Sequence, residues 1–255
     1  MNYKSKLFQF KTNCVNVADV LHSELTKLEN QLVYFGNTEN YTSKREFCGT
    51  LLSKEEIERM KKFAFDDDRL TYCISHGCLR ICLSEFTNMS NEELKIEYHS
   101  NTKPHLINSN LDFNISHSKN YFAFAVAEKS GSIIGVDIEK LNNLKDYKSI
   151  IRDFMHEEEK TYILDDLISN EEQISRFYEI WTRKEAFLKM LGAGIIMNLP
   201  DINVVPGEKT IAVAIPENIN VINIETQIYT KLTSDFVLSV STNYNYTPDF
   251  IEINF

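Results

Sequence analysis

Apolar residues recur at helical spacing in two long stretches of the chain, at about residues 68–85 and 171–191. The first pattern comprises Leu70, Cys73, Ile74, Cys78 and Ile81, and the second comprises Phe177, Ile180, Trp181, Leu188 and Leu191. Because residues three or four positions apart lie on one side of a helix, both stretches predict amphipathic helices. Gly192 and Gly194 follow the second stretch and are expected to end that helix.

Capping residues support these helices and predict others. Ser53 followed by Glu56 forms a capping-box pattern, which predicts a helix that begins after Ser53. Ser169 or Asn170 is expected to cap the second long helix. Before that cap, the polar stretch at about 144–168 is also expected to be helical.

Two apolar runs of strand length stand close together in the middle of the chain. Residues 121–128 (YFAFAVAE) alternate large and small apolar side chains, as a strand covered on both faces would. Residues 133–139 (IIGVDIE) form the second run, and the turn signal between the two runs predicts a hairpin. Residues 98–110 are expected to be loop, and residues 200–255 short strands. Helices combined with an antiparallel hairpin predict an α+β fold.

Length and composition are those of a water-soluble protein that can bury its own core. The 255 residues are 43% apolar and 25% charged, and they suit one large domain or two modest ones. We place the division between residues 118 and 119, which gives an N-terminal half (1–118) and a C-terminal half (119–255). A formal net charge of −10 argues against non-specific nucleic-acid binding, which needs a basic surface.

Neither a leader nor a membrane anchor is expected from the sequence. The first residues lack the apolar core of a signal peptide, and no run approaches the ~20 apolar residues of a membrane span. We therefore expect a cytoplasmic protein without membrane contact. The five cysteines are odd in number and include no C-x-x-C pair, which predicts core residues in place of a disulfide framework or a zinc site.

Asp137 and Glu139 form the first candidate site. Alternate residues of a strand share a face, so these carboxylates point the same way with Cα atoms roughly 6.5–7 Å apart. Two carboxylates at that spacing can bind one Mg²⁺ ion, which keeps other positions for phosphate oxygens. A solvated acidic strand end is the alternative, because most surface carboxylates do no chemistry.

A second candidate lies in the predicted helix at 171–191. Glu185 and Lys189 are four residues apart and share one helical face, either as a simple salt bridge or as part of a site. In an active site, Glu185 would be a third metal ligand or a base. Lys184 and Lys189 would hold phosphates as point charges.

Two further segments are weaker candidates. Residues 114–118 (NISHS) place a hydroxyl beside an imidazole at a strand entrance. There Ser116 and His117 could grip a phosphate, or the segment could be a turn held by side-chain-to-backbone bonds. Lys103 precedes Pro104, whose fixed backbone could aim the lysine.

Taken in order along the chain, these motifs resemble one known family. The segments are Lys103-Pro104, FNISHS at 113–118, IGVDIE at 134–139 and FYEIWTRKEAFLKMLGAGI at 177–195. Together they resemble the 4′-phosphopantetheinyl transferases of the long, surfactin-synthetase-activating (Sfp-like) type, over roughly residues 54–195. The ordered set carries the resemblance, because each motif alone is common.

The resemblance implies a role for each candidate residue. Asp137, Glu139 and Glu185 would bind Mg²⁺, and Glu185, Lys189 and Asp137 would be the catalytic residues. Glu185 would be the base for the attacking serine. The implied coenzyme A contacts are Ser116 and His117 to the 3′-phosphate, Lys103 near the nucleotide, Lys184 and Lys189 to the pyrophosphate, and Arg59 and Arg69 in the helices before.

The implied reaction moves the 4′-phosphopantetheine arm of coenzyme A to a serine of an apo acyl or peptidyl carrier protein and releases 3′,5′-ADP. The implied enzyme is of the holo-[acyl-carrier-protein] synthase type, a monomer that serves nonribosomal peptide or polyketide biosynthesis. The family fold has two similar α/β halves related by a pseudo-twofold axis. Each half is an antiparallel sheet packed on a long helix, and the ligand cleft lies between the halves.

Two alternatives use the same residues. A Mg²⁺-dependent hydrolase of nucleotide diphosphates would need the same carboxylates. A catalytically inactive relative would bind carrier proteins without transfer, but the presence of Asp137, Glu139 and Glu185 argues against it.

Overall fold

The computed structural model describes residues 31–98, 103–128, 131–192, 198–207, 210–211, 225–243 and 247–253. The first part contains β1 (Leu32–Asn37), η1 (Thr38–Lys44), α2 (Arg45–Leu51), α3 (Lys54–Met60), α4 (Asp66–Thr87), β2 (Ile96–Glu97), β3 (His105–Leu106), β4 (Leu111–Ser118) and β5 (Tyr121–Glu128). The second part contains β6 (Ile134–Lys140), α5 (Tyr147–Phe154), α6 (Glu157–Ile163), α7 (Asn170–Leu191), η3 (Leu199–Asp201), β7 (Thr210–Ile211), β8 (Glu225–Leu232), β9 (Phe236–Thr242) and β10 (Asp249–Glu252).

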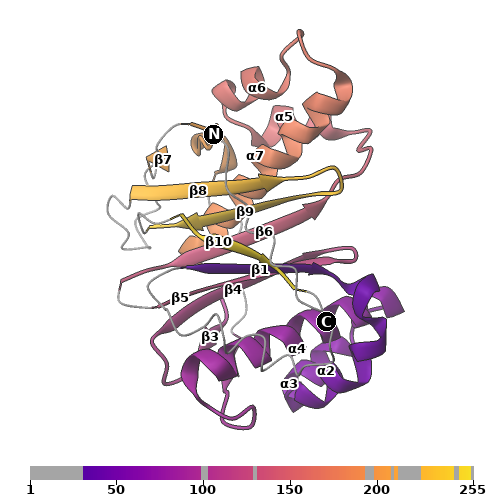
Figure 1. Cartoon of the computed structure of the whole chain (residues 1–255). Coiled ribbons are helices and arrows are strands. Elements are labelled where there is room, and N and C mark those ends of the chain that lie inside the picture. Colours follow the sequence, from indigo (N-terminus) through magenta and orange to yellow (C-terminus); the bar gives the residue numbers. More distant parts are fainter. Residues whose placement is uncertain are drawn as a thin grey trace.

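Two four-stranded sheets lie between two long helices. The strand orders are β10-β1-β5-β4 and β6-β9-β8-β7. One apolar cluster packs the first sheet on α4, a second packs the other sheet on α7, and a third lies between the sheets. Figure 1 shows the resulting order of layers: helix, sheet, sheet, helix. The mixed α+β class is therefore confirmed, and the strand pairs of both sheets are antiparallel except for the parallel pair β1–β10.

The two parts of the chain repeat one order of elements. In each, a strand leads into helices that end with a 22-residue helix, and a hairpin follows. The second strand of the hairpin pairs antiparallel with the opening strand, as β5 does with β1 and β9 with β6. The amino-acid sequence has no detectable repeat that predicts this arrangement.

A buried ion pair also occurs at the same place in each part. Glu56 of α3 pairs with Arg80 of α4 at 3.1 Å, and Glu159 of α6 pairs with Lys184 of α7 at 2.8 Å. Both glutamates are the third residue of a short helix and complete its capping box. Each pair thus ties the start of a short helix to the long helix that follows it.

The helices agree closely with the sequence patterns. α4 and α7 cover the two predicted long stretches, and Ser53 with Glu56 opens α3. Ser169 caps α7, and Gly192 ends it with a φ of 66°. Gly194 lies outside the described residues. The polar stretch at 144–168 forms two short helices, α5 and α6, instead of one.

The predicted hairpin between residues 121–128 and 133–139 is wrong, although both strands exist. β5 pairs with β4 and β1, whereas β6 pairs with β9 in the other sheet. The hairpin partner of β5 is β4. Polar residues alternate with Phe113 and Ile115 in β4, and this polar segment was therefore interpreted as a possible turn. Within the predicted loop at 98–110, residues 105–106 form the short strand β3.

The predicted division between residues 118 and 119 falls in the turn of the β4–β5 hairpin. These strands pair over their whole length within one sheet. The chain passes from the first sheet to the second after β5, and β10 returns to the first sheet beside β1.

Other expectations can be checked in the described ranges. Cys48, Cys73, Cys78 and Cys82 are buried in the apolar cluster around α4, as predicted for core residues. Cys14 lies outside those ranges. Within them, the structure contains no helix that combines the length and the apolarity needed to cross a bilayer.

Gly135 allows α7 to lie unusually close to β6. A Cβ atom on Gly135 would stand 2.1 Å from the carbonyl oxygen of Ala186 and 2.2 Å from the backbone nitrogen of Met190. Both are backbone atoms of α7, so no side-chain rotation relieves the clash. This close approach brings the side chains of α7 onto the face of β6 that also carries Asp137 and Glu139.

Gly135→Ala should therefore destabilise the fold by about 3 kcal/mol or more, because overpacking a rigid contact forces backbone shifts. Gly49→Ala is the matched control, since its Cβ would lie 3.7 Å from the sulfur of Cys73, an ordinary contact. Alanine in helix α2 should leave stability unchanged or raise it by about 0.5–1 kcal/mol. Urea unfolding of both variants checks the difference, and equal midpoints would contradict the close-approach argument.

Candidate active site

Four polar side chains of β4 bind the backbone of β6 across the junction of the two sheets. The pairs are Ile134 N to Asp112 Oδ2 (2.8 Å), Val136 N to Asn114 Oδ1 (2.9 Å), Ile138 N to Ser116 Oγ (3.5 Å) and Lys140 N to Ser118 Oγ (3.2 Å). Each pair is separated by 22 residues, so the register is constant. We refer to these four side chains as the β4 ladder. The β4 ladder accepts hydrogen bonds from the N–H groups of β6 that do not donate to β9.

Asp137 stands at the centre of the candidate site. Its Oδ1 accepts hydrogen bonds from Lys189 Nζ at 2.6 Å and from Ser116 Oγ at 2.8 Å. Lys189 also donates to Ser116 Oγ at 2.9 Å. The other carboxylate oxygen, Asp137 Oδ2, is buried and has no hydrogen-bond partner among the described residues. A buried carboxylate oxygen without a partner is costly unless a donor or a cation reaches it.

Glu139 and Glu185 complete a group of three acidic side chains around Lys189. Ser118 Oγ donates to Glu139 Oε2 at 2.5 Å. Burial, and next to it the charge of Asp137, raises the pKa of Glu139 to about 7, while the Ser118 hydrogen bond opposes the rise. Burial and Asp137 also raise the pKa of Glu185, against the effect of Lys189. These carboxylates lie close enough to disfavour one another's charge.

The three carboxylates do not, however, form a ready-made three-ligand metal site. Among the described residues, no group of three His, Cys, Asp or Glu side chains is arranged to hold a metal ion. Lys189 instead supplies the nearest positive charge, and its side chain is 30% exposed, so it can reach an external ligand.

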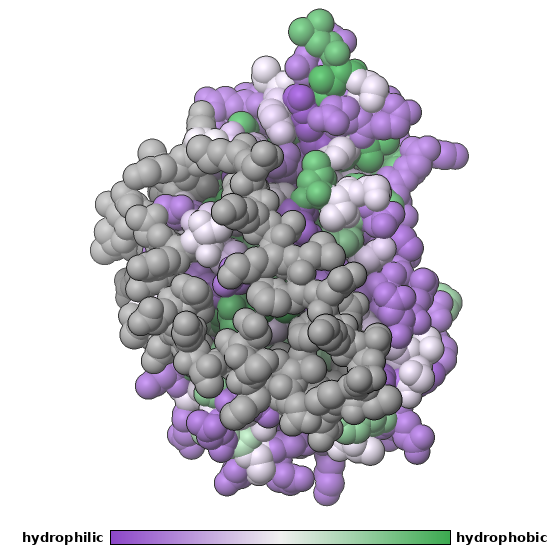
Figure 2. Space-filling model, in the orientation of Figure 1, coloured by the Kyte–Doolittle hydropathy of each residue, from purple (hydrophilic) through white to green (hydrophobic). Residues whose placement is uncertain are grey.

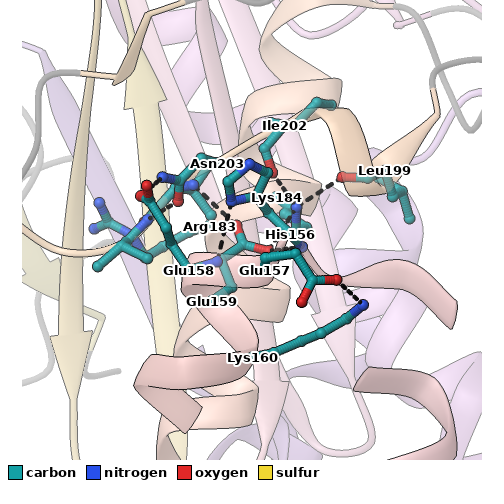
Figure 3. A network of polar contacts seen from close by, with 12 residues as sticks. His156, Glu157, Glu158, Glu159, Lys160, Arg183, Lys184, Leu199, Ile202 and Asn203 are labelled. Atoms are coloured by element: carbon teal, nitrogen blue, oxygen red, sulfur yellow. Dashed lines mark hydrogen bonds and ion pairs between the residues drawn. The ribbon is translucent and has the colours of Figure 1, made fainter. Parts of the chain in front are cut away.

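Lys184 lies on the opposite side of α7 from Lys189, so the structure does not bring the two predicted pyrophosphate contacts together. Its side chain is 1% exposed, and Nζ binds Glu159 Oε2 and the carbonyl oxygen of Leu199, both at 2.8 Å. It also donates to the carbonyl oxygen of Ile202. Figure 3 shows this enclosed network, in which Lys184 faces α6 and η3. Lys184 is thus a structural residue.

Ser116 and His117 point to opposite faces of β4 and do not meet. Ser116 faces β6 and binds Asp137, whereas the ring of His117 lies edge-on to Phe63, between α3 and α4, at 6.5 Å. The structure therefore does not bring the two predicted 3′-phosphate contacts together. The protein around the His117 imidazole partly removes it from water, which lowers its pKa, and the positive charge of Lys189 lowers this pKa further. The imidazole is thus more readily neutral than an ordinary histidine.

The remaining predicted contacts already have protein partners. Lys103 forms an ion pair with Asp112 and donates to the carbonyl oxygen of Ile134 at 2.6 Å, which ties it to the β4 ladder. Arg59 lies over the ring of Tyr98, 4.1 Å from its centroid. Arg69 binds the carbonyl oxygen of Phe63 at 2.7 Å, which places it beside the residue that packs on His117.

Several residues of the site were missed from sequence. Asp112, Asn114 and Ser118 hold β6, and Glu159 encloses Lys184. A signal for the ladder exists, because polar residues stand at every second position from 112 to 118, which is strand spacing. No comparable signal identifies Glu159, which stands among three consecutive glutamates.

Comparisons with known proteins match both parts of the chain. The family model of the 4′-phosphopantetheinyl transferase superfamily matches residues 133–241, which run from β6 to β9. A model of the 4′-phosphopantetheinyl transferase N-terminal region matches residues 40–129.

Individual relatives are also similar to the chain. The 4′-phosphopantetheinyl transferase HetI of Nostoc sp. is 34% identical over 148 residues, which are 56% of this chain and 61% of that protein. The 4′-phosphopantetheinyl transferase gsp of Aneurinibacillus migulanus is 30% identical over 149 residues, 58% of this chain and 60% of that protein. Sfp of Bacillus subtilis is 25% identical over 156 residues, 61% of this chain and 66% of that protein. The matched region thus spans 60–66% of the length of these relatives.

Lys184→Met should lower the free energy of unfolding by about 3–5 kcal/mol, because it leaves the buried carboxylate of Glu159 without its cation. The double variant Glu159→Leu with Lys184→Met removes both charges and should recover most of that loss. Urea unfolding measures both. A single variant as stable as the unaltered protein would contradict the structural role of Lys184.

The raised pKa of Glu139 predicts a specific pH dependence of stability. Between the ordinary pKa of 4.5 and the folded value of about 7, the folded chain holds a proton that the unfolded chain has released. Ionised Glu139 thus costs stability as the pH rises through this window. Glu139→Gln should raise the melting temperature by about 2–4 °C at pH 8 in metal-free buffer. The gain should vanish near pH 4.5, and a gain that is equal at both pH values would exclude this explanation.

Proposed function

Because the chain belongs to the 4′-phosphopantetheinyl transferase superfamily, we propose that it transfers the 4′-phosphopantetheine group of coenzyme A to a carrier-protein serine and releases 3′,5′-ADP. The observation that carries this proposal is the centre at Asp137. It combines a buried carboxylate oxygen that has no partner, a partly exposed lysine and two carboxylates with raised pKa values. Such a centre suits a reaction that depends on positioning and on charge stabilisation.

A Mg²⁺ ion fits this centre as a cofactor. Asp137 would hold it through Oδ2, and Glu139 and Glu185 are the other candidate ligands. Mg²⁺ usually takes one or two protein carboxylates and completes its shell with water and phosphate oxygens, so a full set of three protein ligands is not required. When bound there, Mg²⁺ supplies positive charge that stabilises the pyrophosphate oxygens of the leaving group.

The remaining side chains supply binding and proton transfer. Lys189 holds a pyrophosphate oxygen with the donor capacity that Asp137 and Ser116 leave free, since an ammonium group has three protons. Glu185 takes the proton of the attacking serine hydroxyl, and its raised pKa brings it closer to the working pH of a general base. His117, Arg59 and Arg69 are the proposed contacts to the nucleotide end of coenzyme A.

The architecture supports a ligand cleft between two similar halves. The repeated order of strand, helices and hairpin, and the equivalent ion pairs Glu56–Arg80 and Glu159–Lys184, favour halves related by a pseudo-twofold axis. β4 and β6 meet at the junction of the halves, and Asp137 lies there. We place coenzyme A along this junction, between α4 and α7.

The acceptor is proposed to be an apo carrier protein that docks on an apolar surface. Figure 2 shows apolar residues at the end of the molecule where α5 and α6 lie. Leu167 is 94% exposed in this segment, and Phe154 and Leu164 are also exposed. The nearby Arg152 and Lys160 already pair with carboxylates of their own helices, so salt should weaken docking only mildly.

Finer assignments are part of the same proposal. The similarity to Sfp favours the long, Sfp-like type, and we propose carriers of nonribosomal peptide or polyketide biosynthesis as acceptors. We propose a cytoplasmic monomer of the holo-[acyl-carrier-protein] synthase type that needs neither nucleic acid nor membrane. HetI, gsp and Sfp are each named as a 4′-phosphopantetheinyl transferase, which favours the transferase over a nucleotide-diphosphate hydrolase.

Incubation with coenzyme A, Mg²⁺ and a panel of apo acyl and peptidyl carriers should add one phosphopantetheine to at least one carrier, as seen by intact mass. Asp137→Ala should lower the rate about 100-fold or more, because it removes the centre's buried charge. Asp235→Ala, at an exposed turn, should leave the rate unchanged. Release of 3′,5′-ADP without any modified carrier would favour the hydrolase instead. If Asp137→Ala keeps the full transfer rate, as Asp235→Ala is expected to, the proposed role of Asp137 is contradicted.

A further inference from the structure

The β4 ladder gives β6 a neighbour that is made of side chains. Among the strands that the structure describes, β6 is the edge strand of its sheet and pairs only with β9. Its residues 134, 136, 138 and 140 turn their N–H groups away from β9, and the ladder receives all four. The register of β6 along β4 is therefore set by the hydrogen bonds that β4 side chains accept from the β6 backbone.

The face of β4 and β5 that carries the ladder is shaped for this contact. Ala125 of β5 stands opposite Asn114, and Ala123 stands opposite Ser116. Both alanines are fully buried in the apolar cluster between the sheets. Because these side chains are small, β6 can come close enough for short side chains of β4 to reach its backbone.

Asn114 is the side chain of the β4 ladder for which the described contacts include no hydrogen bond to a proposed site residue. It is 4% exposed, and its Oδ1 accepts from Val136 N at 2.9 Å. Val136 directly precedes Asp137, so this bond fixes the backbone that carries the central carboxylate. The next rungs, Ser116 and Ser118, bind both the backbone of β6 and the carboxylates of Asp137 and Glu139.

We propose that Asn114 is a positioning residue, which acts through Val136 to hold Asp137 and Glu139 where they bind the divalent cation. This inference rests on the proposed function. The inference extends the proposed function to a residue outside the predicted catalytic and binding set. The first sheet would then support the cation site on the second sheet. Residues that orient metal ligands from behind typically change affinity or activity 10–100-fold when they are replaced.

Three variants test this role. Asn114→Ala removes the acceptor, and Asn114→Ser retains a hydroxyl acceptor of the kind that Ser116 and Ser118 already provide. Asn91→Ala is the control for a lost asparagine in the first part of the chain, where Asn91 donates to the carbonyl oxygen of Leu51 at 2.9 Å and accepts from Arg80 Nε at 2.8 Å. Asn114→Leu, which also lacks the acceptor but is closer in size to asparagine, replaces Asn114→Ala if the latter proves insoluble, and the same losses are expected of it.

Each variant is measured by Mn²⁺ binding without coenzyme A, by hydrogen exchange of the Val136 amide and by transfer kinetics. Asn114→Ala should weaken Mn²⁺ binding and lower kcat about tenfold each, with the KM for coenzyme A within about twofold of wild type. The Val136 amide should exchange about tenfold faster, because its hydrogen-bond acceptor is gone. Asn114→Ser should stay within about threefold of wild type in Mn²⁺ binding and kcat. Asn91→Ala should lower only the melting temperature.

Two results would overturn the proposal. If Asn114→Ala lowers the melting temperature as Asn91→Ala does, but keeps the Mn²⁺ affinity and kcat of wild type, Asn114 is structural only. If Asn114→Ser loses as much as Asn114→Ala, the acceptor is not the relevant feature. Should the wild-type protein modify no carrier, the proposed function fails, while Mn²⁺ binding and amide exchange still decide the role of Asn114.

Discussion

The backbone of β6 must find hydrogen-bond partners along an edge that no strand in the described part of the chain pairs with. Unpaired buried N–H groups are costly, and an uncovered strand edge can pair with another chain. In this protein β4 solves the problem with Asp112, Asn114, Ser116 and Ser118, each bound to the N–H group 22 residues further along. The solution joins the two sheets and fixes the strand that carries Asp137 and Glu139.

The electrostatics of the site follow from this placement. Asp137 is nearly inaccessible to water, so its charge needs a nearby counter-charge, and Lys189 provides one at 2.6 Å. The close approach at Gly135 is what lets α7 present Lys189 and Glu185 to β6. Lys189 neutralises one of three neighbouring acidic groups, which leaves a surplus of negative charge. A divalent cation is the natural complement to that surplus, and a diphosphate brings further oxygen ligands to the same cation.

Much of the fold followed from the chain's periodicity, because α4 and α7 carry apolar residues at helical spacing and α7 also has a clear cap at each end. The shared face of Asp137 and Glu139 also followed from strand geometry alone. Strand pairing did not, since β5 and β6 are close in sequence but belong to different sheets. Local turn signals cannot reveal a strand that pairs with β9, about a hundred residues away.

Two pairs of candidate residues were expected to act together, but the structure separates the members of each pair. In both cases the reason is the direction of the side chains. Lys184 and Lys189 are five residues apart and so lie about 140° apart around a helix, too far to grip one group. Ser116 and His117 are neighbours on a strand and must face opposite ways. Both points were available from the sequence once the elements were known. The enclosure of Lys184 by Glu159 was not, because it depends on how α6 and η3 pack on α7.

The most direct test of this account is a crystal structure with coenzyme A and Mg²⁺. The account predicts Mg²⁺ at about 2.0–2.1 Å from Asp137 Oδ2, in contact with a pyrophosphate oxygen, with Lys189 and the β4 ladder still in place. A cation bound elsewhere, with Asp137 Oδ2 bonded only to protein, would contradict it.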